Sequence, residues 1–206
     1  MNKVFIEAKD KNTSEYHLID TILSSFFSIK EVEIVPMDGI SNLFKEAILN
    51  QIVQAQIMSD NVLVLADADT VAKEWGFAKR KQDIEEKMLV NNVSFPFFLY
   101  PNHRDDGDVE VLMESVARRD LHSVFFDCFE DYEKCIQRVK DSNGQPLYNT
   151  PNLKGKLHTY VTAQKLSNNK RKRLGHGDWQ FNDPDLWDLN GDPLQPLIHF
   201  LKENLI

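Results

Sequence analysis

NVLVLADAD, residues 61–69, joins an unbroken apolar run to a pair of aspartates. An apolar run of this length without alternation is typical of a strand buried on both faces, and such strands form parallel sheets that helices cover on both sides. Further strands are predicted at residues 3–6 (KVFI), 31–36 (EVEIVP) and 95–100 (FPFFLY). The strand at residues 61–65 is therefore expected to lie inside a sheet, with its carboxyl end leading into the two aspartates.

Helical spacing of apolar residues separates these runs. Leu18, Ile19 and Ile22 lie on one face of a predicted helix, for which Asn12 or Thr13 is the expected N-cap. Other helices are predicted at residues 43–55, 78–89, 109–117, 154–166 and 194–205. This alternation of strands and helices predicts an α/β fold with a mainly parallel sheet flanked by helices.

The length of the chain limits how many domains it can form. With 206 residues, of which 42% are hydrophobic, it can bury one full core but is short for two. We expect a single domain with a core at about residues 1–140 and a helical and irregular C-terminal extension at about residues 141–206. Residues 175–192 of this extension are predicted to form a long surface strap. Three aromatic side chains are expected to pin the strap to the core: Trp179, Phe181 and Trp187.

Composition excludes several classes of function. The formal net charge of -8 argues against an extended phosphate-binding surface, so contact with nucleic acid is expected to be local or mediated by metal. The N-terminus lacks the apolar run of a signal peptide, and no run is long enough to span a bilayer, so we expect a cytoplasmic protein without membrane contact. Cys128 and Cys135 are interpreted as packing residues. The basic cluster NNKRKR at residues 168–173 is interpreted as a solvated loop, with contact to a nucleic-acid backbone as the alternative.

The acidic residues after two of the strands suggest a binding site. Glu7 follows the first strand, and Asp67 and Asp69 follow the strand at residues 61–65. Ligand sites in open parallel sheets lie beyond the carboxyl ends of the strands. In an extended chain Asp67 and Asp69 would point the same way and Ala68 the opposite way. If the two strands are neighbours, three carboxylates converge.

Converging carboxylates need a compensating charge, because like charges a few ångströms apart in a partly buried site resist ionising together. A hard divalent cation supplies it. Oxygen ligands without nearby His or Cys favour Mg²⁺, Mn²⁺ or Ca²⁺ over zinc, and Mg²⁺ held by few carboxylates also coordinates substrate phosphates. The acids therefore predict chemistry at phosphate.

Two segments carry a resemblance to a known family. IEAKD (residues 6–10) and VLADAD (residues 64–69) resemble the two motifs of the Toprim domain of topoisomerases, primases and several nucleases. Within that family, the resemblance points to small bacterial Toprim-like proteins and the overcoming-lysogenization-defect nucleases. DDGDVE (residues 105–110) resembles a further acidic segment of that group. Ala8 stands where the family usually has Gly. The resemblance implies these metal ligands: Glu7, Asp10, Asp67, Asp69 and Glu110, with Asp106 and Asp108 as weaker candidates.

The same resemblance implies a function. It is metal-dependent cleavage or transfer of phosphodiesters in nucleic acid with Mg²⁺ or Mn²⁺, in phage defence or nucleic-acid processing. Glu7 would act as a ligand or general base, with Asp67 and Asp69 holding the ions. The family also implies a lysine that stabilises charge at the scissile phosphate, and chain order points to Lys156, or alternatively to Lys154.

Three alternatives stay open. The acids near Glu110 could be solvated residues at a helix N-terminus, where the helix dipole favours negative charge. The chain could be a non-catalytic Toprim-like module that binds a protein partner, a second copy of itself or nucleic acid, with a vestigial metal site. It could also resemble phosphatases of the haloacid dehalogenase type, with Asp67 as nucleophile and Asp69 as general acid and base. In that superfamily the motif normally lies on the first strand, and Glu7 would have no role.

Overall fold

A computed structural model describes residues 1–27 and 32–205 and shows an α/β fold with a parallel sheet. The predicted fold class is confirmed. Glu31, expected as the first residue of the second strand, lies outside the described residues. The sheet contains four strands: β1 (Asn2–Ile6), β2 (Val32–Pro36), β3 (Val62–Asp67) and β4 (Phe97–Tyr100).

The strand order is β2-β1-β3-β4, and every pair of neighbours is parallel. Val4 of β1 is in register with Ile34 of β2 on one side and with Leu63 of β3 on the other. β1 and β3 are therefore neighbours, as the site hypothesis required. The chain adds β2 on one side of β1 and β3 and β4 on the other, so the strand order reverses between β1 and β3. Such a switch point leaves a crevice beyond the carboxyl ends of the strands.

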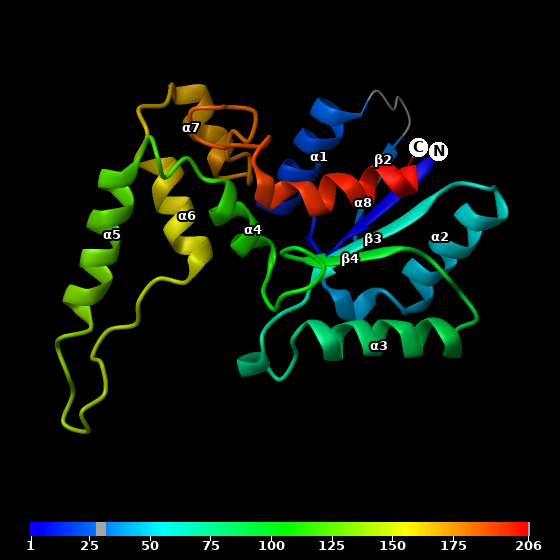
Figure 1. Cartoon of the computed structure of the whole chain (residues 1–206), viewed down its shortest axis with the longest axis horizontal. Coiled ribbons are helices and arrows are strands. Elements are labelled where there is room, and N and C mark those ends of the chain that lie inside the picture. Colours follow the sequence, from blue (N-terminus) through cyan, green and yellow to red (C-terminus); the bar gives the residue numbers. More distant parts are fainter. Residues whose placement is uncertain (28–31, 206) are drawn as a thin grey trace.

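Helices cover both faces of the sheet (Figure 1). α2 and α3 pack on one face, where they bury Phe5 and Val64, and α1 and α8 pack on the other, where they bury Val4 and Leu65. This division follows from the alternation of side chains along each strand. The helices have these bounds: α1 (Ser14–Phe26), α2 (Glu46–Ile57), α3 (Phe77–Val90), α4 (Val109–Val116), α5 (Ser123–Ile136), α6 (Leu153–Thr162), α7 (Asn168–Leu174) and α8 (Gln195–Leu205).

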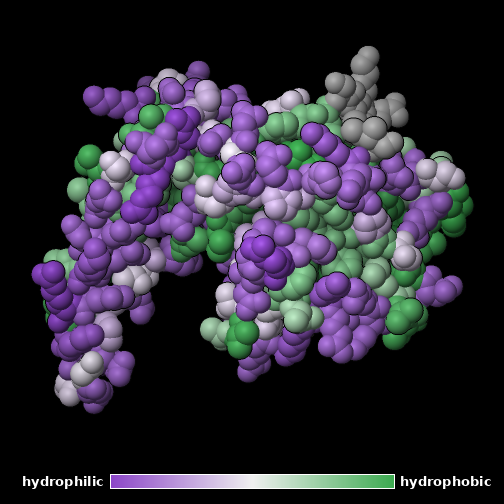
Figure 2. Space-filling model, viewed as in Figure 1, coloured by the Kyte–Doolittle hydropathy of each residue, from purple (hydrophilic) through white to green (hydrophobic). Residues whose placement is uncertain are grey.

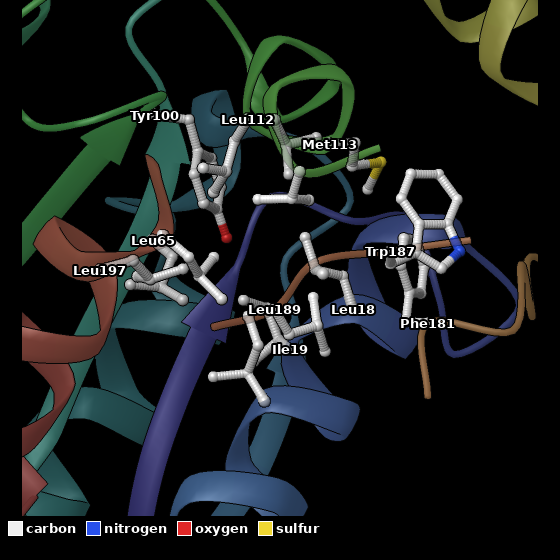
Figure 3. Packing of buried hydrophobic residues seen from close by; sticks show 14 of the residues in the cluster. Leu18, Ile19, Leu65, Tyr100, Leu112, Met113, Phe181, Trp187, Leu189 and Leu197 are labelled. Carbon is white, nitrogen blue, oxygen red and sulfur yellow. The ribbon is translucent and has the colours of Figure 1, made fainter. Parts of the chain in front are cut away.

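The face covered by α1 carries the larger of two buried apolar clusters, and the C-terminal extension contributes to it directly. In Figure 3, Leu18 and Ile19 of α1 pack together with Leu65 of β3, Leu189 of the strap and Leu197 of α8. The extension is therefore part of the main core rather than an addition to a finished domain.

α5 and α6, with the loop that joins them, extend away from the sheet on one side of the molecule (Figure 1). We call residues 121–162 the arm. Phe125 and Phe126 of α5 pack against Tyr160 of α6, with ring centroids 5.4 and 5.0 Å apart. The boundary expected near residue 140 falls in the loop of this arm.

The prediction for the basic cluster was wrong in part, because residues 168–174 form helix α7 rather than a loop. The side chain of Ser167 caps this helix by accepting a hydrogen bond from the backbone N–H of Lys170, and Leu174 is buried at its end. The prediction for the cysteines was also wrong, since Cys128 and Cys135 are both exposed on α5.

The strap at residues 175–192 is pinned as predicted, because Trp179, Phe181 and Trp187 are all buried. It also crosses the first turn of α1. Gly177 has φ +76°, and a Cβ atom there would lie 2.3 Å from the carbonyl carbon of Thr13. Only glycine tolerates both this backbone conformation and the close approach of Thr13 without strain. The strap therefore covers the N-terminus of α1.

Among residues 1–27 and 32–205, no helix is both long enough and apolar enough to cross a bilayer.

Candidate functional site

Glu7 and Asp67 lie together at the carboxyl ends of neighbouring strands. The backbone N–H of Asp67 donates a hydrogen bond to Oε2 of Glu7 at 3.1 Å. Oδ1 of Asp67 accepts a hydrogen bond from the backbone N–H of Val109, the first residue of α4, at 2.8 Å. The predicted pairing of these two acids is thus present at the switch point of the sheet.

Glu15 is a third acid at this place, and the sequence interpretation gave it no role in the site. It is 7% exposed, and its Oε1 atom has no hydrogen-bond partner. Burial is the main cause that raises the pKa of Glu15 to about 8, and the negative charge of Glu7 adds to the increase. The backbone N–H groups of Glu7 and Ala8 oppose it. Glu15 is therefore protonated in the folded protein near neutral pH.

The pKa values of the other two acids rise for similar reasons. Burial raises the pKa of Glu7, while the backbone N–H of Asp67 lowers it. Burial also holds the pKa of Asp67 well above its usual range, and the charges of Glu7 and Glu15 add to the effect. We call Glu7, Glu15 and Asp67 the acid triad. Burial and neighbouring negative charge both disfavour the ionised forms of these three acids, as expected for buried carboxyl groups without a counter-ion.

Asp69 lies at the same end of the sheet but in a different environment. β3 ends at Asp67, and Asp69 has φ +58°, so the expectation that Asp67 and Asp69 point the same way as residues of one extended strand was wrong. The carboxylate of Asp69 pairs with the guanidinium of Arg80 at 2.6 Å and with Nζ of Lys73 at 2.9 Å. Arg80 is itself buried and stacks over the ring of Trp75 at 3.7 Å. Two cations already compensate the charge of Asp69.

The remaining acids of the predicted ligand set have separate local roles. Asp10 is exposed and accepts a hydrogen bond from the backbone N–H of Asn12 within its own turn. The carboxylate of Asp106 accepts from the backbone N–H of Phe77 at the start of α3, and Asp108 is the N-cap of α4. The contacts of Asp106 and Asp108 match the alternative interpretation as acids at a helix N-terminus.

Glu110 and a lysine complete the site. Glu110 lies in the first turn of α4, its side chain is 13% exposed, and it pairs with Nζ of Lys154 at 3.0 Å. Lys156, the residue proposed from sequence for the scissile phosphate, is buried and pairs with Glu114 at 2.7 Å. Of the two candidate lysines, Lys154 is therefore the one that reaches the site, and Lys156 holds α6 against α4.

A pocket of about 380 Å³ opens beside the acid triad. It lies between the arm and the body of the molecule, where Figure 2 shows the surface hollowed. Acids from β3 and α4 form part of its wall, and two lysines and the start of α6 form the rest. The lining residues are Asp67, Lys73, Asp108, Glu110, Asn152, Leu153 and Lys154.

The side chains, as they are placed, do not form a complete metal cage. Among residues 1–27 and 32–205, no three His, Cys, Asp or Glu side chains group closely enough to hold a metal ion. Each carboxylate at the site instead faces an N–H group, a lysine or an arginine, apart from the orphaned Oε1 of Glu15. The chemistry of the donors still fits a hard cation, because all of them are carboxylate oxygens.

Together the fold and the site define a class of protein: a parallel α/β domain with buried acids at the switch point of its sheet. A family model described as "Protein of unknown function (DUF3226)" matches residues 1–205, so the chain belongs to this family. Searches of curated proteins and of solved structures returned no match.

Proposed function

We propose that this chain is a cytoplasmic enzyme that uses Mg²⁺ or Mn²⁺ to cleave or transfer phosphodiesters in nucleic acid, as its resemblance to Toprim domains implies. The observation that carries the proposal is the acid triad. Glu7, Glu15 and Asp67 share a buried place at the switch point, and in the described part of the chain none of them forms an ion pair within 4 Å. A buried acid either holds a proton, as Glu15 does, or needs a counter-charge, and a bound cation would supply that charge to the acid triad.

Glu7, Asp67 and Glu110 would hold the metal, and the unpartnered Oε1 of Glu15 offers a further oxygen. When bound, the metal would supply the charge that activates water and stabilises the oxygens at phosphorus. Ligation would require Asp67 to exchange its contact with the N–H of Val109 for the cation, and Glu110 to release Lys154.

The lysines at the pocket fit a phosphate group. Lys73 and Lys154 line the pocket together with its acids, and both side chains are more than half exposed. A lysine released from Glu110 would be free to contact a phosphate oxygen as a point charge. Because the whole chain carries a charge of -8, nucleic-acid contact is confined to this pocket and its rim.

One observation favours a second candidate, a non-catalytic interaction module. Asp69, which the resemblance makes a metal ligand, is already neutralised by Arg80 and Lys73. A vestigial site would retain such pairing and bind no metal. The same pairing disfavours the phosphatase alternative, since Asp69 would have to exchange protons freely.

Titration calorimetry with Mg²⁺ and Mn²⁺ separates these candidates. The wild-type protein should bind the ions, and Asp67→Asn should lose binding while keeping its thermal unfolding temperature near that of the wild type, because the amide oxygen can still accept the N–H of Val109. Asp10→Asn is the matched control, since Asp10 lies in the loop after β1 and its carboxylate is used within its own turn. This variant should bind as the wild type does.

A nuclease assay on single-stranded and duplex DNA and RNA then tests catalysis. Asp67→Asn should lower the metal-dependent rate by about 100-fold or more, the loss expected when one positioned charge-stabilising group is removed. Metal-dependent cleavage that persists in this variant would contradict the proposal. Absence of metal binding in the wild type would favour the interaction module.

A further inference from the structure

The outer face of α5 carries apolar side chains that the fold does not use. Val124, Cys128, Tyr132 and Cys135 follow one another at intervals of four, four and three residues, which places them on one side of the helix. All four are exposed; Val124 is 74% and Tyr132 48% exposed. Other residues of α5 pack against α6, and of the row Tyr132 also contacts the ring of Phe129, with ring centroids 5.8 Å apart.

The row continues past both ends of the helix. Leu121 precedes α5 and Val139 follows it, and they are 53% and 47% exposed. The backbone N–H of Leu147 donates to the carbonyl oxygen of Val139 at 2.9 Å, which brings exposed Leu147 and Tyr148 to the far end of the same row. We call the row from Leu121 to Val139 the apolar stripe. A contiguous exposed apolar strip of this kind marks an interaction surface.

One flank of the apolar stripe carries exposed charges at helical spacing, with an acidic N-terminal half and a basic C-terminal half. These charges are Asp127, Asp131, Lys134 and Arg138. Within the same chain Asp127 pairs with Arg119 at 3.4 Å and Asp131 with Lys134 at 3.2 Å, and exposed ion pairs of this kind contribute little to stability. The surface is thus complementary to itself when one copy is turned end over end.

We propose that the apolar stripe binds a second copy of this chain, with the two α5 helices antiparallel about a two-fold axis near Glu130. In this arrangement Leu121 lies opposite Val139 of the second copy, and Cys128 lies opposite Tyr132. About this axis, Asp127 of each arm lies across from Lys134 of the other. An interface that is the same patch on both subunits is the usual form of a protein dimer.

Charge also argues against other occupants. A parallel pair of α5 helices would set acids against acids and bases against bases, which is unfavourable. A nucleic acid would be repelled by the acidic half of the stripe. The antiparallel pair alone matches both the apolar row and the two charged halves. It is independent of metal binding at the pocket.

Light scattering coupled to size exclusion tests the proposal on the full chain. The wild type should show twice the 23.9 kDa mass of one chain. The acidic variant, Lys134→Glu with Arg138→Glu, should be a monomer, because both halves of its stripe repel a second copy. The basic variant, Asp127→Lys with Asp131→Lys, should be a monomer for the same reason. An equimolar mixture of the two should recover the dimer mass, because each now supplies the charge that the other lacks.

Val124→Asp tests the apolar part and should also give a monomer. Leu89→Asp is its matched control, because Leu89 is 82% exposed on α3, away from the arm, and this variant should stay a dimer. Circular dichroism checks that every variant keeps its helices. A wild type that is monomeric at its highest soluble concentration overturns the proposal, and so does a mixture of charge variants that fails to pair.

Discussion

Two groups of acids lie at the same end of one sheet and differ in how their charge is compensated. The acid triad of Glu7, Glu15 and Asp67 is buried and has raised pKa values. Asp69, only two residues after Asp67, pairs with Arg80 and Lys73. The difference shows that closeness in sequence to the end of a strand does not determine which acids are free to bind a ligand. The partners that the fold brings to each acid decide it.

The backbone explains how two such close residues separate. Asp67 is the last residue of β3 and still follows the strand, so its side chain reaches the start of α4. Asp69 adopts the left-handed conformation, which aspartate tolerates better than most residues, and its side chain meets α3 through Arg80. A two-residue turn therefore divides an uncompensated site from an ion pair.

The largest expected effect comes from Glu15, whose substitution tests whether the acid triad is uncompensated. Its folded pKa of about 8 exceeds the ordinary value of 4.5, so the folded state holds the extra proton between these values. The free energy of unfolding must then fall as pH rises through this window, by about 4 to 5 kcal/mol from this group. Glu15→Gln removes that fall, so the variant should be more stable than the wild type by roughly this amount above about pH 8. Urea unfolding over a pH series measures it.

Glu46→Gln is the control for this experiment. Glu46 is also an acid in the first turn of a helix, but it is exposed on α2. Its pH profile should follow that of the wild type. If Glu15→Gln likewise ran parallel to the wild type at all pH values, Glu15 would be compensated in solution and the contrast between the two acid groups would fail.

A smaller effect is expected from Arg80, which tests the other side of the comparison. Arg80→Met keeps an apolar stem but removes the charge from a residue that is 5% exposed and lies 2.6 Å from Asp69. Breaking a buried ion pair typically costs 3–5 kcal/mol, and because Lys73 remains, we expect about 2–3 kcal/mol in the free energy of unfolding. Chemical unfolding of the single variants and of the double variant with Asp69→Asn measures the coupling. A coupling energy near zero would show that Arg80 stabilises the fold through Trp75 rather than through Asp69.

Much of the fold could be predicted because its signals are local. Buried strands such as residues 62–66 are apolar without interruption, and their order with helices specifies a parallel sheet. The pairing of Glu7 with Asp67 was predicted on the condition that their two strands are neighbours, and β1 and β3 are neighbours in the sheet. The orientation of Asp69 did not, because alternation applies only while the chain stays extended, and nothing in the letters ADAD tells where the strand ends.

The burial of Glu15 was not predicted from the sequence, although one signal for it was present. It shares a helix face with Leu18, Ile19 and Ile22, and that face points to the core. An acid in a first turn is ordinarily solvated and explained by the helix dipole, so periodicity alone gave no reason to bury it. The groups that act on its side chain come from other elements, with Glu7 and Ala8 after β1 and Glu110 on α4, 95 residues further along the chain. Such long-range contacts have no local signal.

The smallest effect is expected from Lys73, which shares Asp69 with Arg80 but is 56% exposed. Nζ of Lys73 donates a hydrogen bond to Asp69 at 2.9 Å, and this contact raises the pKa of Lys73. Solvent and salt screen such a pair, however, and exposed ion pairs contribute about 1 kcal/mol or less. Lys73→Gln should therefore cost less than about 1 kcal/mol at low salt, and the difference should vanish at about 0.5 M salt, as measured by urea unfolding. A loss as large as that of Arg80→Met would mean that Asp69 depends on an exposed lysine, and Asp69 would then be available to a metal ion whenever that lysine moved away.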